Sequence, residues 1–316
     1  MPNILFICGS MNQTTMMTQI ASHLGDGNCT FTAYYGDGFI QRLASAGLLD
    51  STILGNRIRN RTFQYLRQNG YPVDPSGQER PYHLVVTCSD LIIPRNIADL
   101  PIVLVQEGMT DPEDSRYRLV QTLKLPRYLA NTSMTGLSHA YRFFCVASQG
   151  YKNLFVRKGI PAHKIAVTGI PNFDNAVSWT RNDFPYRGYV LAATSHLRET
   201  FKYENRKKFI RNVLSIADGR PVLFKLHPAE KVSRAIREIR RHAPDAMVMS
   251  EGNVFHMVAN AEALVTRYSS VILGALALGK PVYSDYPASF LGPLTPIQNG
   301  GRSAEAIAAL CREILG

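Results

Sequence analysis

Two neighbouring serines lie where a strand is predicted to end and a helix to begin. They are Ser269 and Ser270, in the sequence Val-Thr-Arg-Tyr-Ser-Ser-Val of residues 265–271. The unpaired N–H groups and positive dipole end of a helix attract anions, and two small hydroxyls add donors without blocking a phosphate. Arg267 adds a positive charge to the same turn. The turn therefore predicts an anion site, with the alternative that Ser269 only caps the helix.

A second group of candidates follows other strands of the same half. His227 precedes a proline in the sequence Phe-Lys-Leu-His-Pro of residues 224–228. Ligands of open parallel sheets bind at the carboxyl ends of the strands, where an imidazole can donate to phosphate or exchange a proton. We group Lys225, Thr194 and Arg198 with His227 as candidates for binding phosphate. A guanidinium such as that of Arg198 can bind phosphate through two hydrogen bonds. The alternatives are a structural histidine and an ordinary exposed arginine.

The amino-terminal half offers a glycine turn and two carboxylates. Gly9 and Ser10 follow the first predicted strand, and a glycine lets the backbone approach a ligand closely. Glu107 and Asp111 follow another strand, with Gly108 between them. Such carboxylates can accept a proton from a reacting group. The alternative is that Glu107 only binds N–H groups of its own loop.

Composition limits the class of protein. The 316 residues contain 35 Lys and Arg against 24 Asp and Glu, a formal net charge of +11 that indicates an anionic partner. With 45% hydrophobic residues, the chain is neither disordered nor fibrous. Its five cysteines form no CxxC pair, which argues against disulfides and zinc and favours a reducing cytoplasm. The sequence does not open like a signal peptide, and no apolar run suits a membrane span.

Short apolar runs alternate with helical patterns, which is typical of parallel sheets covered by helices. The length suggests two domains. We predict an α/β protein with two Rossmann-like domains, residues 1–177 and 188–316, joined by a linker over 178–187. A C-terminal helix over 303–315 is predicted to start with Ser303 as its N-cap and can pack back toward the first domain. Strands are expected at residues 4–8, 84–87, 102–105, 143–147, 165–167, 189–193, 221–226, 246–249, 263–266 and 281–284.

Taken in order, these motifs resemble a known superfamily. Residues 146–174, which end in Ile-Ala-Val-Thr-Gly-Ile-Pro-Asn-Phe-Asp, look like the end of the first domain of GT-B enzymes related to UDP-N-acetylglucosamine 2-epimerase and to CDP-glycerol glycerophosphotransferases. His-Pro at 227–228 and Ser-Ser at 269–270 match motifs of bacterial sialyltransferases, Kdo transferases and glycerophosphotransferases. Many of them share the Leu-Gly-Lys-Pro-Val of residues 278–282. The resemblance covers about residues 140–285 and implies two Rossmann-like domains that face each other across a cleft.

The resemblance implies a glycosyltransferase that uses a nucleotide-activated donor such as a UDP-, CDP- or CMP-sugar. The donor would be held mainly by the second domain and a saccharide or lipid-linked acceptor by the first, with its Gly9, Ser10 and Gly108. Donor phosphate would contact the His-Pro and Ser-Ser motifs, with help from Arg198 and Arg267. No cofactor or metal is expected, and the sequence contains no Asp-x-Asp motif.

An inverting transferase needs a group that takes the proton of the acceptor hydroxyl. Glu107 resembles the position where related transferases have Gln-His-Gly or an acidic residue before glycine, so we expect it to be the base. Asp111 is the second candidate, and His227 is counted with the catalytic residues.

Three alternatives to sugar transfer stay open, two of them enzymatic and one non-catalytic. One is glycerol phosphate transfer, and another is sugar-nucleotide epimerisation. The epimerases have Thr-Asp-Ser-Gly-Gly where this chain has Thr-Arg-Tyr-Ser-Ser, which disfavours that activity. The third is a GT-B module that binds nucleotide without catalysis.

Basic helices predicted over residues 202–211 and 231–241 carry much of the positive charge. They are either solvated faces or a peripheral contact with an anionic membrane, on its inner face for a cytoplasmic protein. Arg57, Arg59 and Arg61 are candidates for contact with an anionic acceptor. Nucleic acid is not expected, because no RNA-binding signature or helix-turn-helix is present.

Overall fold

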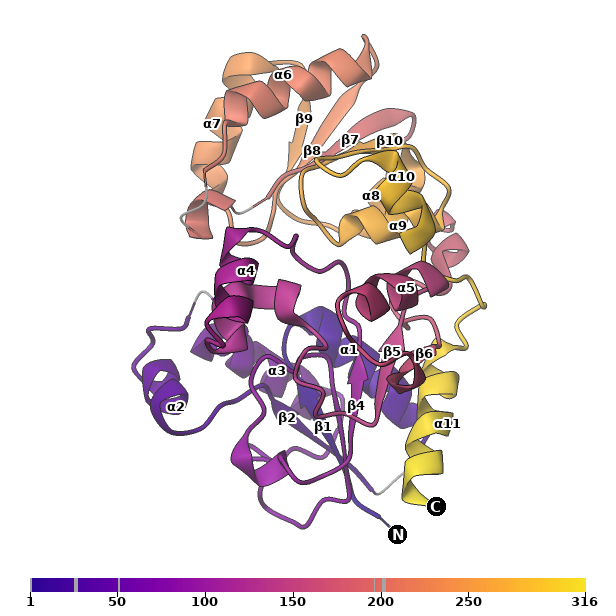
Figure 1. Cartoon of the computed structure of the whole chain (residues 1–316). Helices are drawn as coiled ribbons and strands as arrows, with labels where there is room; N and C mark the ends of the chain where they lie inside the picture. The colour runs from indigo at the N-terminus through magenta and orange to yellow at the C-terminus, as the bar shows by residue number, and fades with distance from the viewer. Residues whose placement is uncertain (1, 26–27, 51, 196, 201–202) are drawn as a thin grey trace. The chain divides into compact units, whose positions relative to one another are not determined.

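The computed structural model contains two compact units (Figure 1). The first unit comprises residues 1–174 and 299–316, and the second comprises residues 175–298. The structure describes residues 2–25, 28–50, 52–195, 197–200 and 203–316. Each unit is built on one sheet of parallel strands with helices. The predicted α/β class is therefore confirmed.

The first unit has a six-stranded parallel sheet in the order β2-β1-β3-β4-β5-β6. Its strands are β1 (Ile4–Cys8), β2 (Cys29–Ala33), β3 (Leu84–Thr87), β4 (Ile102–Val105), β5 (Phe143–Val146) and β6 (Ile165–Val167). All five residues of β1 are buried, because the strand lies between two others and under helices. β2 was not predicted from the sequence. Its Thr30 and Thr32 interrupt the apolar run, yet both are buried beside Phe31.

The helices of the first unit include the last one of the chain. They are α1 (Met11–Ser22), α2 (Gly38–Ser45), α3 (Asn56–Gln68), α4 (Ser115–Thr122), α5 (Gln149–Arg157) and α11 (Ser303–Leu315). α11, yellow in Figure 1, packs against α1 and β3 and buries Ile307 and Cys311. The chain thus leaves the first unit after Asp174 and returns at Asn299. The residues predicted as a linker, 178–187, belong to the second unit.

The start of α11 differs from the prediction. Ser303 is the first helical residue and not its N-cap, and its hydroxyl accepts a hydrogen bond from Asn299 Nδ2 at 3.1 Å. The Oδ2 atom of Asp174 accepts from the Ser303 N–H at 2.8 Å. A carboxylate from a distant part of the chain therefore supplies the capping acceptor that the sequence suggested would be local.

The second unit has a five-stranded parallel sheet in the order β11-β10-β7-β8-β9. Its strands are β7 (Tyr189–Ala193), β8 (Val222–Lys225), β9 (Met247–Met249), β10 (Ala261–Val265) and β11 (Val282–Tyr283). Its helices are α6 (Arg206–Ala217), α7 (Val232–His242), α8 (Val254–Asn260), α9 (Val271–Ala277) and α10 (Ala288–Leu291). In Figure 1, α6 and α7 lie on one side of this sheet and α8 to α10 on the other. Buried residues of α6 and α7, such as Ile210 and Ile239, form one core with Val190 and Phe224.

Two further sequence expectations concern cysteines and membrane spans. All five cysteines are buried, and none of these described residues is part of a disulfide bond. Within the described ranges, no helix combines the length and hydropathy that crossing a bilayer requires.

Candidate functional site

The polar residues of the first unit gather where its strand order changes direction. From β1 the chain continues to β2 on one side, and β3 lies on the other side. Such a switch point is where ligands of doubly wound sheets bind, at the carboxyl ends of the strands. Gly9 and Ser10 follow β1 there, and Ser10 caps α1 by accepting from the Gln13 N–H at 3.3 Å.

Glu107 joins this edge from the end of β4. Ser10 Oγ donates to Glu107 Oε1 at 2.7 Å, and Gln13 Nε2 donates to Oε2 at 2.5 Å. The carboxylate is half-buried, and no described cation forms an ion pair with it. Burial, and then the nearby charge of Glu107, raise the pKa of the Cys88 thiol well above its usual value. The structure therefore brings together Ser10 and Glu107, which the sequence analysis had singled out separately.

Two neighbours of Glu107 have different roles. Gly108 is buried, and its carbonyl accepts from Gln106 Nε2 at 2.9 Å. Gln106, which was missed in the sequence, also accepts from the Ala147 N–H at 2.9 Å and so ties the ends of β4 and β5 together. Asp111 is bound to Thr132: its N–H donates to Thr132 Oγ1 at 2.8 Å, and that hydroxyl donates to Asp111 Oδ2 at 2.8 Å.

The second unit has its own switch point between β7 and β10. The chain runs from β7 through β8 to β9 on one side, and then crosses to β10 and β11 on the other. Thr194, His227 and Thr266 follow the neighbouring strands β7, β8 and β10. Thr194 N–H donates to the Lys225 carbonyl at 3.0 Å, and Thr266 Oγ1 donates to the Ala193 carbonyl at 2.8 Å. The ends of the three strands are therefore fixed to one another.

A buried carboxylate organises the His-Pro turn. Glu230 Oε2 accepts from the His227 N–H at 3.1 Å and from the hydroxyl of Thr194, and its Oε1 accepts from Arg206. His227 Nδ1 accepts from the Ala229 N–H at 3.1 Å, so a neutral ring carries its proton on Nε2. Glu230 was not predicted from the sequence. Its position three residues after His227 was a signal for this contact in the sequence, because from there a side chain can reach back to a backbone N–H.

Lys225 is buried beneath the same turn. Its Nζ donates to the carbonyls of Leu226 at 3.1 Å and Ser250 at 2.8 Å. Burial lowers the pKa of this ammonium from its ordinary value. The lysine therefore binds backbone at the ends of β8 and β9.

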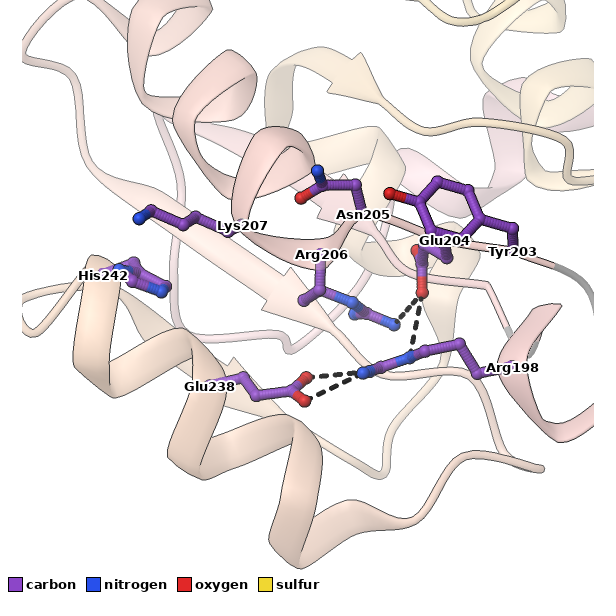
Figure 2. A pocket seen from close by; sticks show the side chains of 8 residues that line it. All are labelled: Arg198, Tyr203, Glu204, Asn205, Arg206, Lys207, Glu238 and His242. Atoms are coloured by element: carbon purple, nitrogen blue, oxygen red, sulfur yellow. Dashed lines mark hydrogen bonds and ion pairs between the residues drawn. The ribbon is translucent and has the colours of Figure 1, made fainter.

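Arg198 is bound by carboxylates, as Figure 2 shows. Its two terminal nitrogens donate to Glu238 at 2.8 Å each, and its Nε lies 3.3 Å from Glu204 Oε2. The hydrogen bonds from Arg198 hold the pKa of Glu238 below its usual value. Glu204 also pairs with Arg206 at 2.9 Å. These residues line a cavity of about 410 Å³. Glu238 lies 40 positions from Arg198, so the sequence alone did not indicate this pair.

The Ser-Ser turn follows β10 and opens α9. Ser269 Oγ accepts from the Val271 N–H at 3.3 Å, so it does bind the start of the helix. Ser270 occupies the N-cap position but makes no capping hydrogen bond with its side chain. Arg267 Nε donates to Asp285 Oδ2 at 2.8 Å, and its guanidinium lies over the Tyr268 ring. The turn thus presents a hydroxyl that binds the helix start, a second hydroxyl that does not cap the helix, and a paired arginine. Among the described residues, no group of three or more His, Cys, Asp or Glu side chains is arranged to hold a metal ion.

This architecture is that of the GT-B fold, with two parallel-sheet α/β units. No protein-family model and no curated protein matches the sequence. Among solved structures, UDP-GlcNAc 2-epimerase from Neisseria meningitidis bound to UDP-GlcNAc has a TM-score of 0.60 and 12% identity, covering 98% of this chain and 100% of its own. The wall teichoic acid polymerase TagF has a TM-score of 0.55 and 11% identity, covering 99% and 89%. HepE from Anabaena in complex with UDP has a TM-score of 0.53 and 15% identity, covering 98% and 90%. At these identities the likeness establishes the fold.

Proposed function

We propose that the chain is a glycosyltransferase that moves a sugar from a nucleotide-activated donor to a saccharide or lipid-linked acceptor of the cell surface. The observation that carries the proposal is the switch-point edge of the second unit. There Thr194, the His-Pro turn and the Ser-Ser turn follow three neighbouring strands. Solved structures with this fold hold UDP-GlcNAc and UDP. We also propose a cytoplasmic location, because the sequence contains five cysteines without a CxxC pair, a usage typical of a reducing compartment.

In the proposed donor site, the phosphates bind at the Ser-Ser turn. The Ser270 hydroxyl is a donor that the helix does not use, and His227 carries a proton on Nε2 when neutral. Donors of this kind stabilise the negative charge that develops on the leaving nucleotide. Arg198 and Arg267 have carboxylate partners, so we assign them to holding the surrounding loops. Thr194 and Lys225 are likewise assigned a structural role, because they fix the strand ends through hydrogen bonds to backbone carbonyls.

In the proposed reaction, Glu107 takes the proton of the acceptor hydroxyl. The acceptor oxygen then forms a bond to the anomeric carbon while the bond from that carbon to the donor phosphate breaks. The nucleotide leaves with the electron pair of that bond. Ser10 and Gln13 orient the Glu107 carboxylate through neutral hydrogen bonds, and Gly108 lies beside it in a loop fixed by Gln106. Asp111 is the second candidate for the base.

Glycerol phosphate transfer is the second candidate function. The likeness to TagF favours it, because one TagF structure was soaked with CDPG. In that case the acceptor oxygen would form a bond to the glycerol-bearing phosphorus of CDP-glycerol while the bond from that phosphorus to the bridging oxygen breaks. CMP would leave with the electron pair of that bond, and Glu107 would take the acceptor proton as before. The epimerase likeness supports a nucleotide-sugar ligand equally well, but an epimerase would release no nucleotide as its product.

Nucleotide binding tests the proposal directly. Calorimetric titration of the full chain with UDP, CDP, CMP and GDP should give saturable binding of at least one. Ser270→Ala should weaken that binding about tenfold, the effect of losing one hydrogen bond to a charged group. The control is Ser215→Ala, an exposed serine of α6.

Two outcomes would contradict the donor site. One is that no nucleotide binds, and the other is that both serine variants bind like the native chain. Release of nucleotide from UDP- or CMP-sugars and from CDP-glycerol, each with saccharide acceptors, then separates the two transfer reactions. Binding without any turnover would indicate a non-catalytic module.

A further inference from the structure

Five exposed apolar side chains are gathered in one short stretch of the first unit. They lie on α4, on the loop after it and on the 3-10 helix η2 (Arg127–Met134), and each is between 36% and 59% exposed. We call them the leucine patch: Leu119, Leu123, Leu125, Tyr128 and Leu129. So many apolar groups at the surface of a short segment mark an interaction site.

The patch is held on an ordered base. α4 and η2 pack together, and Tyr117, Val120, Ala130 and Met134 form a buried cluster beneath them. The loop between them is fixed by the Leu125 N–H, which donates to the Val120 carbonyl at 3.0 Å. The exposed leucines are therefore the outer side of a packed substructure.

The same segment is strongly basic. Residues 115–129 contain four cations, Arg116, Arg118, Lys124 and Arg127, and no carboxylate. Arg127 donates to the Asp90 carbonyl, and the other three cations are exposed. The two acidic residues just before α4 lie at its amino-terminal end: Asp114 accepts from the first N–H groups of α4, and Glu113 lies 3.9 Å from Lys158.

We propose that the leucine patch docks the protein on the surface of an anionic lipid bilayer. Leucines enter the boundary between head groups and acyl chains while neighbouring cations bind anionic head groups. A second copy of the chain fits less well, because a symmetric contact would bring the cations together. The basic helices α6 and α7 are poorer candidates, since Leu214 and Val232 are their only large exposed apolar residues in the described part of the chain. Docking is independent of the transfer reaction.

Vesicle sedimentation with the full chain tests this inference. The native protein should bind vesicles of phosphatidylcholine with phosphatidylglycerol and bind poorly to phosphatidylcholine alone. Leu119→Ser with Leu123→Ser should lower partitioning about 100-fold, because two leucines no longer enter the bilayer. Leu48→Ser, an exposed leucine after α2, is the matched control and should bind like the native chain.

A charge-reversed variant provides a second measurement. Arg116→Glu with Arg118→Glu should lower binding to the anionic vesicles at least tenfold. The proposal is overturned if the native chain does not bind anionic vesicles. It is equally overturned if the double leucine variant binds these vesicles as well as the Leu48 variant does. It is also overturned if sedimentation velocity shows a dimer that the leucine variant dissociates while neither protein binds vesicles. Thermal unfolding of each variant checks that it is folded.

Discussion

Three charged residues singled out in the sequence have contrasting surroundings. Arg198 and Arg267 face carboxylates, so their charges are matched within the protein. Glu107 is held only by the neutral donors Ser10 and Gln13 among the described side chains. A carboxylate that is oriented without being neutralised is suited to accept a proton from a bound hydroxyl.

Glu107→Gln should separate chemistry from binding. The amide cannot take the acceptor proton, so turnover should fall about 100-fold or more, while the dissociation constant of the nucleotide stays unchanged. Turnover is measured as nucleotide release with the donor found by titration. Glu79→Gln, at an exposed position of the same unit, is the control. Near-native turnover of Glu107→Gln would remove it from the role of base.

The identities of several site residues could be predicted, but their partners could not. Ser10 and Glu107 both follow strands, which the apolar pattern indicates, yet 97 positions separate them. Glu230 and Arg206 are charged and would normally be assigned to solvent. They are buried as an ion pair: Arg206 Nη2 donates to Glu230, and Glu230 also accepts from the hydroxyl of Thr194. The pairing of β7 with β8 and the packing of α6 on β8 bring their segments together.

At the level of elements, α11 contributes to the core of a unit that is otherwise built from distant sequence. Its Ile307, Ala308 and Cys311 are buried, and Asp174 caps its first turn. The apolar pattern of residues 303–315 predicted the helix itself. The surface on which it packs was not predictable. Amphipathicity shows that one face of a helix is covered, but it does not show which element covers it.

Ile307→Ala should destabilise the first unit. Removing a fully buried isoleucine side chain costs about 2–5 kcal/mol, through lost burial and the cavity that remains. Urea unfolding followed by circular dichroism measures this loss. Glu313→Ala, on the exposed side of the same helix, should change stability by less than about 0.5 kcal/mol. Equal stability of both variants would contradict the observed packing of α11.

Strands were easier to predict than the helices of the first unit. All five expected strands of this unit are present, because strands buried on both faces read as apolar runs. α3 was missed because its sequence is mostly polar and basic, with Thr62, Phe63 and Leu66 as its buried residues.

In the second unit, the basic helix expected from residue 202 begins at Arg206, and Lys202 lies outside the described residues.

At the scale of the whole molecule, a continuous second unit is inserted into a discontinuous first one. The apolar pattern indicated two α/β domains, but it could not show that the chain returns to the first after leaving the second. That return depends on the contacts of α11 with α1 and β3, both of which lie more than two hundred residues before it.

A fragment experiment tests this arrangement. Residues 1–174 alone should unfold at a lower urea concentration than the first unit of the full chain, because α11 no longer covers α1 and β3. A synthetic peptide of residues 299–316 should bind the fragment and restore stability in proportion to its concentration. A peptide with Ile307→Asp is the control and should have no effect. A fragment that is fully stable without the peptide would contradict the assignment of α11 to this unit.

The insertion also sets an order of events during translation. The ribosome makes the first 174 residues, then the whole second unit, and only afterwards the helix that completes the first. At about 5–20 residues per second, roughly 6–25 s pass before that helix is available. During this interval the apolar surfaces of α1 and β3 that α11 will cover are open to chaperones and to other nascent chains. The unit that begins synthesis first is the last to finish folding.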